Sequence, residues 1–463
     1  MAVSDSSSRV SLKVGAAFAL PSFTFYIMNG PIVGILPVLY AKERGLDLAA
    51  IGTAMLIARM LDAITDPAIG LASDRTRTRW GSRKPYMMVG ALLTAIGIRF
   101  LFAPPEGVDI VYFFIVYTLM FLTWTMIEIP HSAWISELTR NYDERSKIVT
   151  YRTIAAYCGA LLVVLVPLLP IFESTAMSLQ VMDFIGWFLL VMVPLTMVIT
   201  LWIVPRGDDR PQTRPEPVGN ILSALRLNKP FWFFLAAFTL CHFAVGVAQG
   251  LFFLYLDSYL GIGEMISAVY VPSLIVSILT MPLWLKVMVR VGKRTAWVIG
   301  MLGLIALSPL FLLLPSGEQS FWPYLFLDIA YTLFYSICLI APIAMLADIV
   351  DYDIFRSGGN RAGQYNAFQT LVLKAIRAIG SSLALIVIGL AGFNVAASQQ
   401  TADALLGLKV TIAIVPAILL TGAVLIMLRY PLTARKHQIL RRWLERRDVR
   451  LSNDEGKGAR ING

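Results

Sequence analysis

The sequence predicts an all-α integral membrane protein with twelve transmembrane helices arranged as two six-helix halves. Three observations lead to this fold class. Hydrophobic residues make up 57% of the 463 residues and charged residues only 15%, a balance typical of membrane proteins. Twelve apolar runs are each long enough to cross about 30 Å of hydrocarbon as a helix. Basic clusters follow alternate runs, as expected for a chain that crosses the membrane repeatedly.

The apolar runs set the expected spans, which lie near residues 14–41, 49–72, 84–104, 109–136, 148–171, 182–204, 230–257, 263–288, 295–315, 320–347, 364–394 and 405–430. Basic clusters around Arg75, Arg145 and Arg290 follow the second, fourth and eighth runs, whereas loops such as "APPEGVD" contain no Lys or Arg. This asymmetry predicts that both termini are cytoplasmic, and we expect a multi-pass protein of a bacterial-type inner membrane. The first residues lack a signal-peptide pattern, so the first run is expected to be a retained span.

A polar, proline-rich segment at residues 205–229 is predicted to be a cytoplasmic linker between an N-terminal half (1–204) and a C-terminal half (230–430). The segment "RWGSRKPYMMVG" at position 79 recurs as "RVGKRTAWVIG" at position 290, a shift of 290 − 79 = 211 residues. Two related halves of this kind are typical of major facilitator transporters, which bind their substrate between the halves near the middle of the membrane.

The stretch "ARMLDAITDPAIG" places three charged residues inside an apolar run. Arg59, Asp62 and Asp66 have the spacing i, i+3, i+7, so they share one face of a helix. Each would cost about 3 kcal/mol at the centre of a membrane helix, so this face is expected to look into the protein. Two carboxylates suit a small cation such as Na⁺, and their mutual repulsion also permits H⁺ binding. Arg59 would balance their charge; alternatively, the aspartates only tie helices together.

The internal repeat indicates that this acid pair belongs to one half. The shift of 211 residues carries Asp62 onto Ser273 (62 + 211) and Asp66 onto Ser277 (66 + 211), which predicts a cation site built by the N-terminal half. Glu128, in the fourth run, is a further membrane carboxylate that could bind the cation or a substrate hydroxyl. The alternative is a buried acid paired with an arginine of a neighbouring helix.

Basic and amide side chains are expected to face these acids. Arg152 lies just inside the fifth run, and Gln369, Thr370 and Lys374 can share a face of the eleventh. Together they predict a polar cavity with carboxylates on one side and cations or hydrogen-bond donors on the other. For Arg152, a position at the membrane edge is a competing interpretation.

The motifs "ARMLDAITDPAIG", "MIEIPHSAW" and "NAFQTLVLK" resemble the glycoside/pentoside/hexuronide:cation symporter family of the major facilitator superfamily, and the resemblance covers nearly the whole chain. It implies a major facilitator fold and a site for Na⁺, Li⁺ or H⁺. The cation-binding residues implied are Asp62, Asp66, Thr125 and Glu128. The sugar contacts implied are Trp124, Glu128, Arg152, Gln369, Thr370 and Lys374.

The first span departs from the family pattern. Phe25 and Tyr26 stand where the family carries a Lys-Asp pair that binds sugar hydroxyls. We expect Tyr26 and Trp124 to supply part of a stacking surface instead. Because one acid is lost while Arg152 and Lys374 remain, the cavity is expected to favour an anionic substrate such as a hexuronate.

The predicted function is secondary active symport of a sugar or acidic glycoside, coupled to Na⁺ or H⁺ by alternating access of the two halves. A cation-coupled transporter of lysolipids or other amphiphiles on the same fold is the alternative. The sequence contains no GxxxxGK[ST], HExxH or GxSxG motif, so we expect no catalytic residue, no enzyme activity and no cofactor other than the coupling ion.

The expected partners are a small-molecule substrate and membrane lipid. The net charge of +10 lies in short clusters between the spans, which argues against nucleic-acid binding. The basic tail at residues 431–463 carries apolar residues at helical spacing, namely Ile439, Leu440, Trp443 and Leu444. This pattern predicts an amphipathic helix on the membrane surface.

Overall fold

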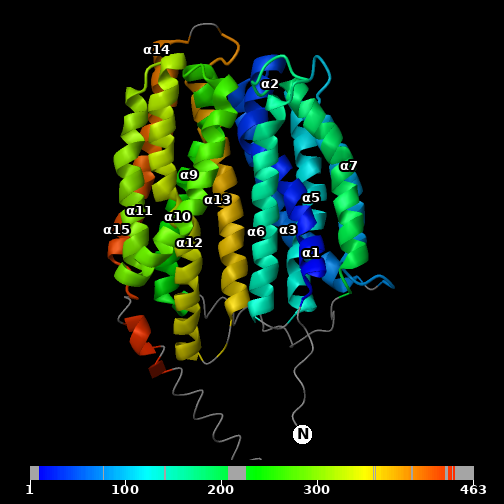
Figure 1. The fold of residues 1–463 in the computed structure, drawn as a ribbon, viewed down its shortest axis with the longest axis vertical. Helices are drawn as coiled ribbons and strands as arrows, with labels where there is room; N and C mark the ends of the chain where they lie inside the picture. Colours follow the sequence, from blue (N-terminus) through cyan, green and yellow to red (C-terminus); the bar gives the residue numbers. More distant parts are fainter. Residues whose placement is uncertain are drawn as a thin grey trace, which may run out of the picture.

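The computed structural model describes residues 10–443, apart from 77, 140–141, 207–225, 358, 360, 398–399, 433–435 and 441. Within these residues every regular element is helical, and the long helices run side by side between the two ends of the molecule (Figure 1). Twelve of the helical segments are long and apolar enough to cross a membrane. The predicted fold class and number of spans are therefore confirmed.

The N-terminal half contains the helices α1 (Leu12–Gly30), α2 (Leu36–Arg44), α3 (Leu48–Arg75), α4 (Lys84–Phe102), α5 (Ile110–Leu138), α6 (Tyr142–Leu165) and α7 (Leu179–Ile203). The C-terminal half contains α9 (Lys229–Leu254), α10 (Ile266–Val291), α11 (Lys293–Leu307), α12 (Phe321–Ser357), α13 (Ala362–Leu390), α14 (Ala402–Lys409) and α15 (Val415–Leu428). Short π-helical turns, Pro31–Ile35 and Val410–Ile414, join α1 to α2 and α14 to α15, so each pair forms one span. The boundaries of the linker at 205–229 stay a prediction.

Helix α3, which carries the charged stretch, begins at a side-chain cap. The Asp47 carboxylate accepts a hydrogen bond of 2.8 Å from the backbone N–H of Ala50, one of the groups that the first helical turn leaves unpaired. From this cap the helix runs without a break to Arg75, even though Pro67 lies inside it. The continuous helix fixes the relative angles of Arg59 and the two aspartates.

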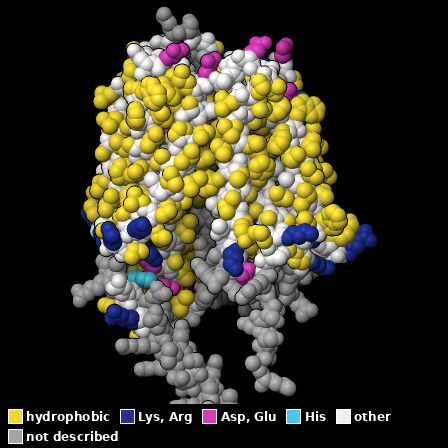
Figure 2. Space-filling model, viewed as in Figure 1, with side chains coloured by type: hydrophobic (Ala, Val, Ile, Leu, Met, Phe, Trp, Pro, Cys, Tyr) yellow, Lys and Arg dark blue, Asp and Glu magenta, His cyan; other side chains and the backbone are white. Residues whose placement is uncertain are grey.

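The surface is divided into three zones (Figure 2). Hydrophobic side chains cover the middle, Lys and Arg gather at the lower end, and Asp and Glu project from the upper end. We call these the basic end and the acidic end. The basic end includes the clusters around Arg83 and Arg290, so the positive-inside rule would put it in the cytoplasm; this sidedness stays a prediction.

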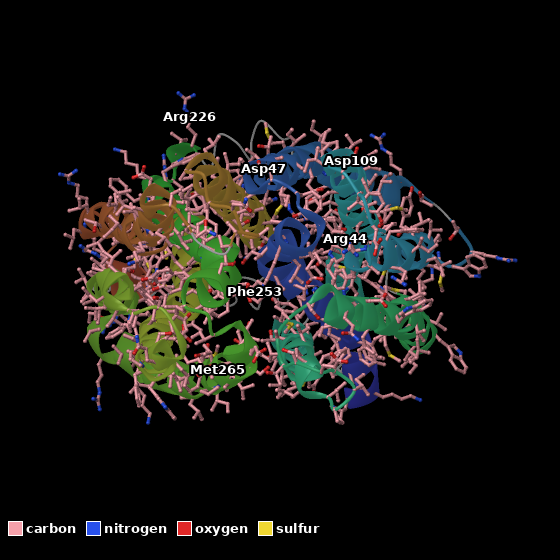
Figure 3. All side chains as sticks on the ribbon, turned by 90° about the horizontal axis from the view of Figure 1, so that it is seen from above. Arg44, Asp47, Asp109, Arg226, Phe253 and Met265 are labelled. Atoms are coloured by element: carbon pink, nitrogen blue, oxygen red, sulfur yellow. The ribbon has the colours of Figure 1, made fainter. Side chains whose placement is uncertain are left out.

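The two halves meet closely toward the acidic end. Helix α3 packs along α13, where a Cβ atom added to Gly389 would lie only 2.8 Å from the Cβ of Ala49. The Lys42 ammonium pairs at 2.7 Å with Asp257 of the other half. Figure 3, seen from the acidic end, shows Phe253 of α9 at the boundary between the halves. The halves are thus closed against each other at the acidic end.

The C-terminal tail packs on the protein at the basic end. The Trp443 ring contacts Phe355 of α12 with a centroid distance of 4.7 Å, and Leu440 is buried. The apolar face that the sequence predicts for the tail therefore lies partly against the C-terminal half and not only against lipid. Leu444 lies outside the described residues.

Candidate functional site

The charged stretch of α3 divides into two differently paired aspartates. Asp62 and Asp66 are both buried, with 7% of each residue exposed. Asp62 accepts a hydrogen bond of 2.9 Å from Arg59 one turn earlier, as the predicted shared face requires. Asp66 accepts a hydrogen bond of 2.9 Å from the hydroxyl of Thr125 on α5. The structure thus brings Thr125 to Asp66, as the family resemblance implies.

Arg59 is held within the N-terminal half by aromatic neighbours. Its guanidinium lies 3.3 Å from the centroid of the Phe121 ring and 3.3 Å from the hydroxyl oxygen of Tyr117. Both aromatic residues belong to α5. A stacked and hydrogen-bonded arginine is a fixed charge, which suits its predicted role as the counter-ion of Asp62.

Lys374 crosses from the C-terminal half into the acid cluster. Its ammonium donates a hydrogen bond of 2.8 Å to Asp66 and lies 3.5 Å from a carboxylate oxygen of Glu128. The sequence predicts that Lys374 contacts the substrate; in the structure it is paired with Asp66, one of the residues predicted to bind the cation. A buried ion pair of this kind exists only because both charges are compensated.

Glu128 lies beside an aromatic pair. It accepts a hydrogen bond of 3.2 Å from the indole N–H of Trp124, one turn earlier on α5. The Trp124 ring is stacked on Phe25 with a centroid distance of 4.5 Å, and only 4% of the residue is exposed. Phe25 therefore covers one face of the predicted stacking surface, while Tyr26 remains 44% exposed beside it.

The remaining predicted contacts differ in their positions. Arg152 donates to the Ser22 hydroxyl at 3.1 Å and lies within electrostatic reach of Glu128 and Tyr26, so it joins the cluster. Thr370 is exposed and donates to a backbone carbonyl of its own helix, and Gln369 is buried. In the part of the chain that the structure describes, neither Gln369 nor Thr370 has a hydrogen bond to the acids.

A cavity of about 360 Å³ lies between the halves. It is lined by residues of both halves, including Tyr26, Asn29, Gln249, Tyr270, Asp328 and Tyr335. Asp328 is a functional candidate that the sequence reasoning missed, although "LFLDIAY" gives the same signal as α3, an acid inside an apolar run. The carboxylates of the membrane region are therefore not confined to the N-terminal half.

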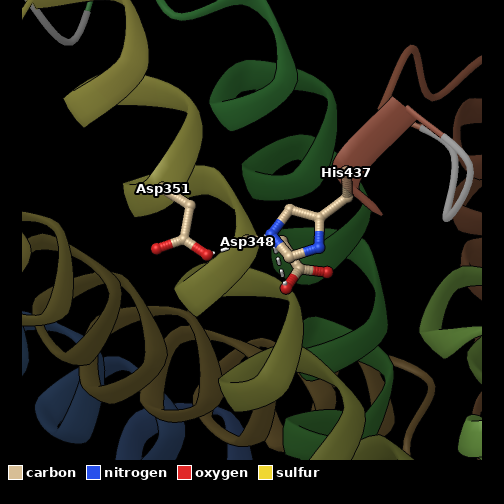
Figure 4. Close-up of side chains that lie close together, drawn as sticks. All are labelled: Asp348, Asp351 and His437. Carbon is tan, nitrogen blue, oxygen red and sulfur yellow. Dashed lines mark hydrogen bonds and ion pairs between the residues drawn. The ribbon is translucent and has the colours of Figure 1, made fainter. Parts of the chain in front are cut away.

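A second ionic cluster lies at the basic end, away from the cavity (Figure 4). His437 of the tail is 3.0 Å from a carboxylate oxygen of Asp351 and 3.4 Å from one of Asp348. Three such side chains can hold a metal ion, but the Lys293 ammonium pairs with the same Asp348 oxygen at 2.5 Å. Since a cation already neutralises Asp348, we interpret the cluster as an ion-pair network that ties the tail to α12.

Comparisons with known proteins bear on the family of the chain. The family model described as "MFS/sugar transport protein" matches residues 17–434. A putative glycoside/cation symporter of Escherichia coli is 26% identical, over 89% of this chain and 90% of its own. The sodium-dependent lysophosphatidylcholine symporter 1 of Xenopus tropicalis is 22% identical over 82% of this chain and 79% of its own.

The fold is also found among solved structures. A bacterial homologue of the human lysosomal transporter Spinster, in an inward-facing and unoccupied conformation, superposes with a TM-score of 0.67. The match covers 92% of this chain and 100% of that chain at 13% sequence identity. At this identity the likeness concerns the fold alone.

Proposed function

Because the chain belongs to the MFS/sugar transport protein family, we propose that it is a secondary active symporter that couples sugar or glycoside transport to a Na⁺ or H⁺ gradient. Membership makes it a multi-pass membrane transporter of a small molecule and not an enzyme, and its symporter relatives support cation coupling. The observation that carries the proposal is the insertion of Lys374 from one half between Asp66 and Glu128 of the other.

The acid cluster has the donor set that a coupling cation needs. Carboxylate oxygens of Asp62, Asp66 and Glu128 and the hydroxyl of Thr125 are hard oxygen ligands, which suit Na⁺, and a carboxylate can take up H⁺ instead. Lys374 now satisfies part of this set. We propose that the incoming cation replaces its ammonium at Asp66.

Displacement of Lys374 provides a route for coupling. An ammonium released from Asp66 loses the nearer of its two carboxylate partners within the membrane interior, which is unfavourable. A substrate that accepts a hydrogen bond from Lys374, or from the nearby Arg152, restores that compensation. Cation and substrate then strengthen each other's binding, and the effect is reciprocal by thermodynamic linkage.

The position of Lys374 also bears on the class of sugar. The expectation of an anionic substrate rests on an excess of free cations, yet Lys374 is paired with Asp66 and near Glu128. Arg152 alone provides a weaker reason to favour a hexuronate. We therefore propose a sugar or glycoside as the substrate and test acidic and neutral members separately.

A lysolipid or another amphiphile is the second candidate. It is favoured by the likeness to the lysophosphatidylcholine symporter and by Phe25, an apolar ring stacked on Trp124 next to Glu128. We further propose that the protein lies in a bacterial-type inner membrane with its basic end and both termini in the cytoplasm, as the charge distribution supports.

Transport into proteoliposomes under separately imposed Na⁺, H⁺ and voltage gradients tests these proposals, with neutral sugars, hexuronates and lysolipids as candidate substrates. We expect one gradient to drive accumulation in the wild type, and Asp66→Asn to abolish it. Asp183→Asn is the matched control, because Asp183 pairs with Arg99 outside the acid cluster. Full gradient-driven accumulation by the Asp66→Asn variant would contradict the cation assignment.

A further inference from the structure

Asp328 of α12 is an intramembrane carboxylate that, among the residues the structure describes, has one hydrogen-bond donor and no cationic partner. The Ser273 hydroxyl of α10 donates to its Oδ2 atom. Within the described residues, no nitrogen of Lys, Arg or His forms an ion pair with Asp328, in contrast to Asp62 and Asp66. An ionisable side chain inside the membrane destabilises the protein, so such residues are usually retained for a function. We therefore consider Asp328 a candidate ligand-binding residue.

The internal repeat relates Ser273, the donor to Asp328, to the predicted cation site of the N-terminal half. Ser273 is the counterpart of Asp62 under the shift of 211 residues (62 + 211 = 273). In the N-terminal half this position carries the acid itself, and in the C-terminal half its serine holds an acid supplied by α12. The C-terminal half thus presents a carboxylate next to the position equivalent to that of Asp62.

The cavity beside Asp328 has the composition of a ligand site. Its volume of about 360 Å³ falls within the range of roughly 300–1,000 Å³ typical of small-molecule pockets. Tyr26 and Tyr270 offer ring surfaces, and the amides of Asn29 and Gln249 each offer a donor and an acceptor. Such a combination of apolar ring faces with a few hydrogen-bond donors and acceptors suits a small ring that carries hydroxyl groups.

One residue of the cavity wall, Tyr26, lies near the acid cluster, and the cavity is closed toward the acidic end. Tyr26 lines the cavity and also lies within electrostatic reach of Arg152, which in turn is near Glu128. At the other side, a Cβ atom on Gly34 would lie 2.9 Å from the carbonyl oxygen of Gln249. A molecule in the cavity would thus lie between the closed acidic end and the acid cluster.

We propose that this cavity is the substrate subsite of the C-terminal half and that it takes the hydroxyl-bearing ring of a neutral glycoside, with Asp328 accepting from a ring hydroxyl. The inference rests on the proposed function, which it deepens by naming the substrate class. A hexuronate would bring a second carboxylate toward Asp328 and be repelled. An ammonium would satisfy Asp328 but leave the amides of Asn29 and Gln249 without the hydroxyl partners that a sugar provides.

Equilibrium binding to the purified full chain tests this subsite. The ligands are the methyl glycosides of glucose, galactose and xylose, each compared with glucuronic acid and glucosamine, and the readout is the ligand-dependent shift of thermal unfolding. We expect at least one neutral glycoside to bind about tenfold or more tightly than either charged sugar. Tighter binding of glucuronic acid or glucosamine, or no binding of any neutral glycoside, would overturn the proposal.

Variants connect the result to Asp328. We expect Asp328→Asn to weaken glycoside binding by about tenfold or more, and Ser273→Ala to weaken it by a smaller factor, because Ser273 orients the carboxylate. Asp183→Asn, which removes a carboxylate that pairs with Arg99 within the N-terminal half and does not line the cavity, is the matched control and should bind as the wild type does. Unchanged affinity in both Asp328→Asn and Ser273→Ala would overturn the assignment.

Cation binding separates this inference from the proposed function. Asp328→Asn should leave the affinity for Na⁺ or H⁺ in the absence of sugar unchanged, since Asp66 and its partners are intact. Sugar flux that ignores every imposed cation gradient would refute symport while leaving glycoside binding at Asp328 untouched. If the wild type binds no neutral glycoside but transports another substrate under a cation gradient, the subsite assignment is refuted and symport is not.

Discussion

Removal of the Lys374 ammonium should raise the affinity of the protein for its coupling cation. In Lys374→Gln the amide cannot neutralise Asp66, which now lies 2.8 Å from the ammonium, or Glu128, which lies 3.5 Å from it. The cation then no longer has to displace a competing charge. The same variant should lose the dependence of cation binding on substrate, because Lys374 is the group through which the two are proposed to communicate.

The size of the effect follows from the geometry. Two unit charges about 4 Å apart interact by about 4 kcal/mol at an effective dielectric constant of about 20. The Lys374 side chain is 28% exposed, so water screens part of this interaction. A remaining difference of about 1.4 to 2.8 kcal/mol corresponds to an increase of roughly tenfold to a hundredfold in cation affinity.

Binding of radioactive Na⁺ to the purified protein measures this increase, and repetition at several pH values reveals competition by protons. Arg377→Gln is the matched control, because Arg377 lies on the same helix but contacts His242 and not the acid cluster. Its cation affinity should equal that of the wild type. The reasoning is refuted if Lys374→Gln binds both Na⁺ and H⁺ with wild-type or weaker affinity.

Three further outcomes are expected. Gly389→Leu should disfavour closure at the acidic end by about 1–3 kcal/mol of overpacking, seen as increased labelling of cysteines placed in the cavity, whereas Gly363→Leu, with open space around it, should not. Arg59→Met should lower the free energy of unfolding by about 3–5 kcal/mol, and the added substitution Asp62→Asn should restore part of it. A single variant as stable as the wild type in thermal unfolding would contradict the pairing. His437→Ala should increase cleavage of the tail by trypsin while lowering the free energy of unfolding by less than about 1 kcal/mol. An unchanged rate of cleavage would argue against the ion-pair network.

The helical period accounts for what could be predicted within one span. Arg59 and Asp62 lie on one face because i and i+3 positions always do, so their ion pair follows from α3 alone. The apolar runs likewise specify the twelve spans, since length and hydropathy are local properties. The spacing within one helix and the number of spans could therefore be predicted from local sequence.

Contacts between helices could not be obtained in this way. The pairing of Lys374 with Asp66 joins residues 374 − 66 = 308 positions apart and depends on how α13 docks against α3. Phe25 was identified as a departure from the family pattern, but its stack on Trp124 depends on the packing of α1 against α5. The tail shows the same limit, because an apolar helix face does not specify whether lipid or protein covers it.

The charges around Lys374 balance in the described structure, and this balance explains why one cation could be coupled to one substrate. Three cations are matched by three carboxylates: Arg59, Arg152 and Lys374 against Asp62, Asp66 and Glu128. A coupling cation therefore leaves one positive charge in excess, and the charge is borne by the ammonium that it displaces. An ammonium without a hydrogen-bond acceptor opposes passage through the closed, dehydrated state, so the cation-loaded carrier should change state only after a substrate oxygen accepts a hydrogen bond from Lys374. The acid cluster without a bound cation is neutral. This neutrality, and not only the presence of carboxylates, would prevent the protein from carrying the cation across the membrane without a substrate.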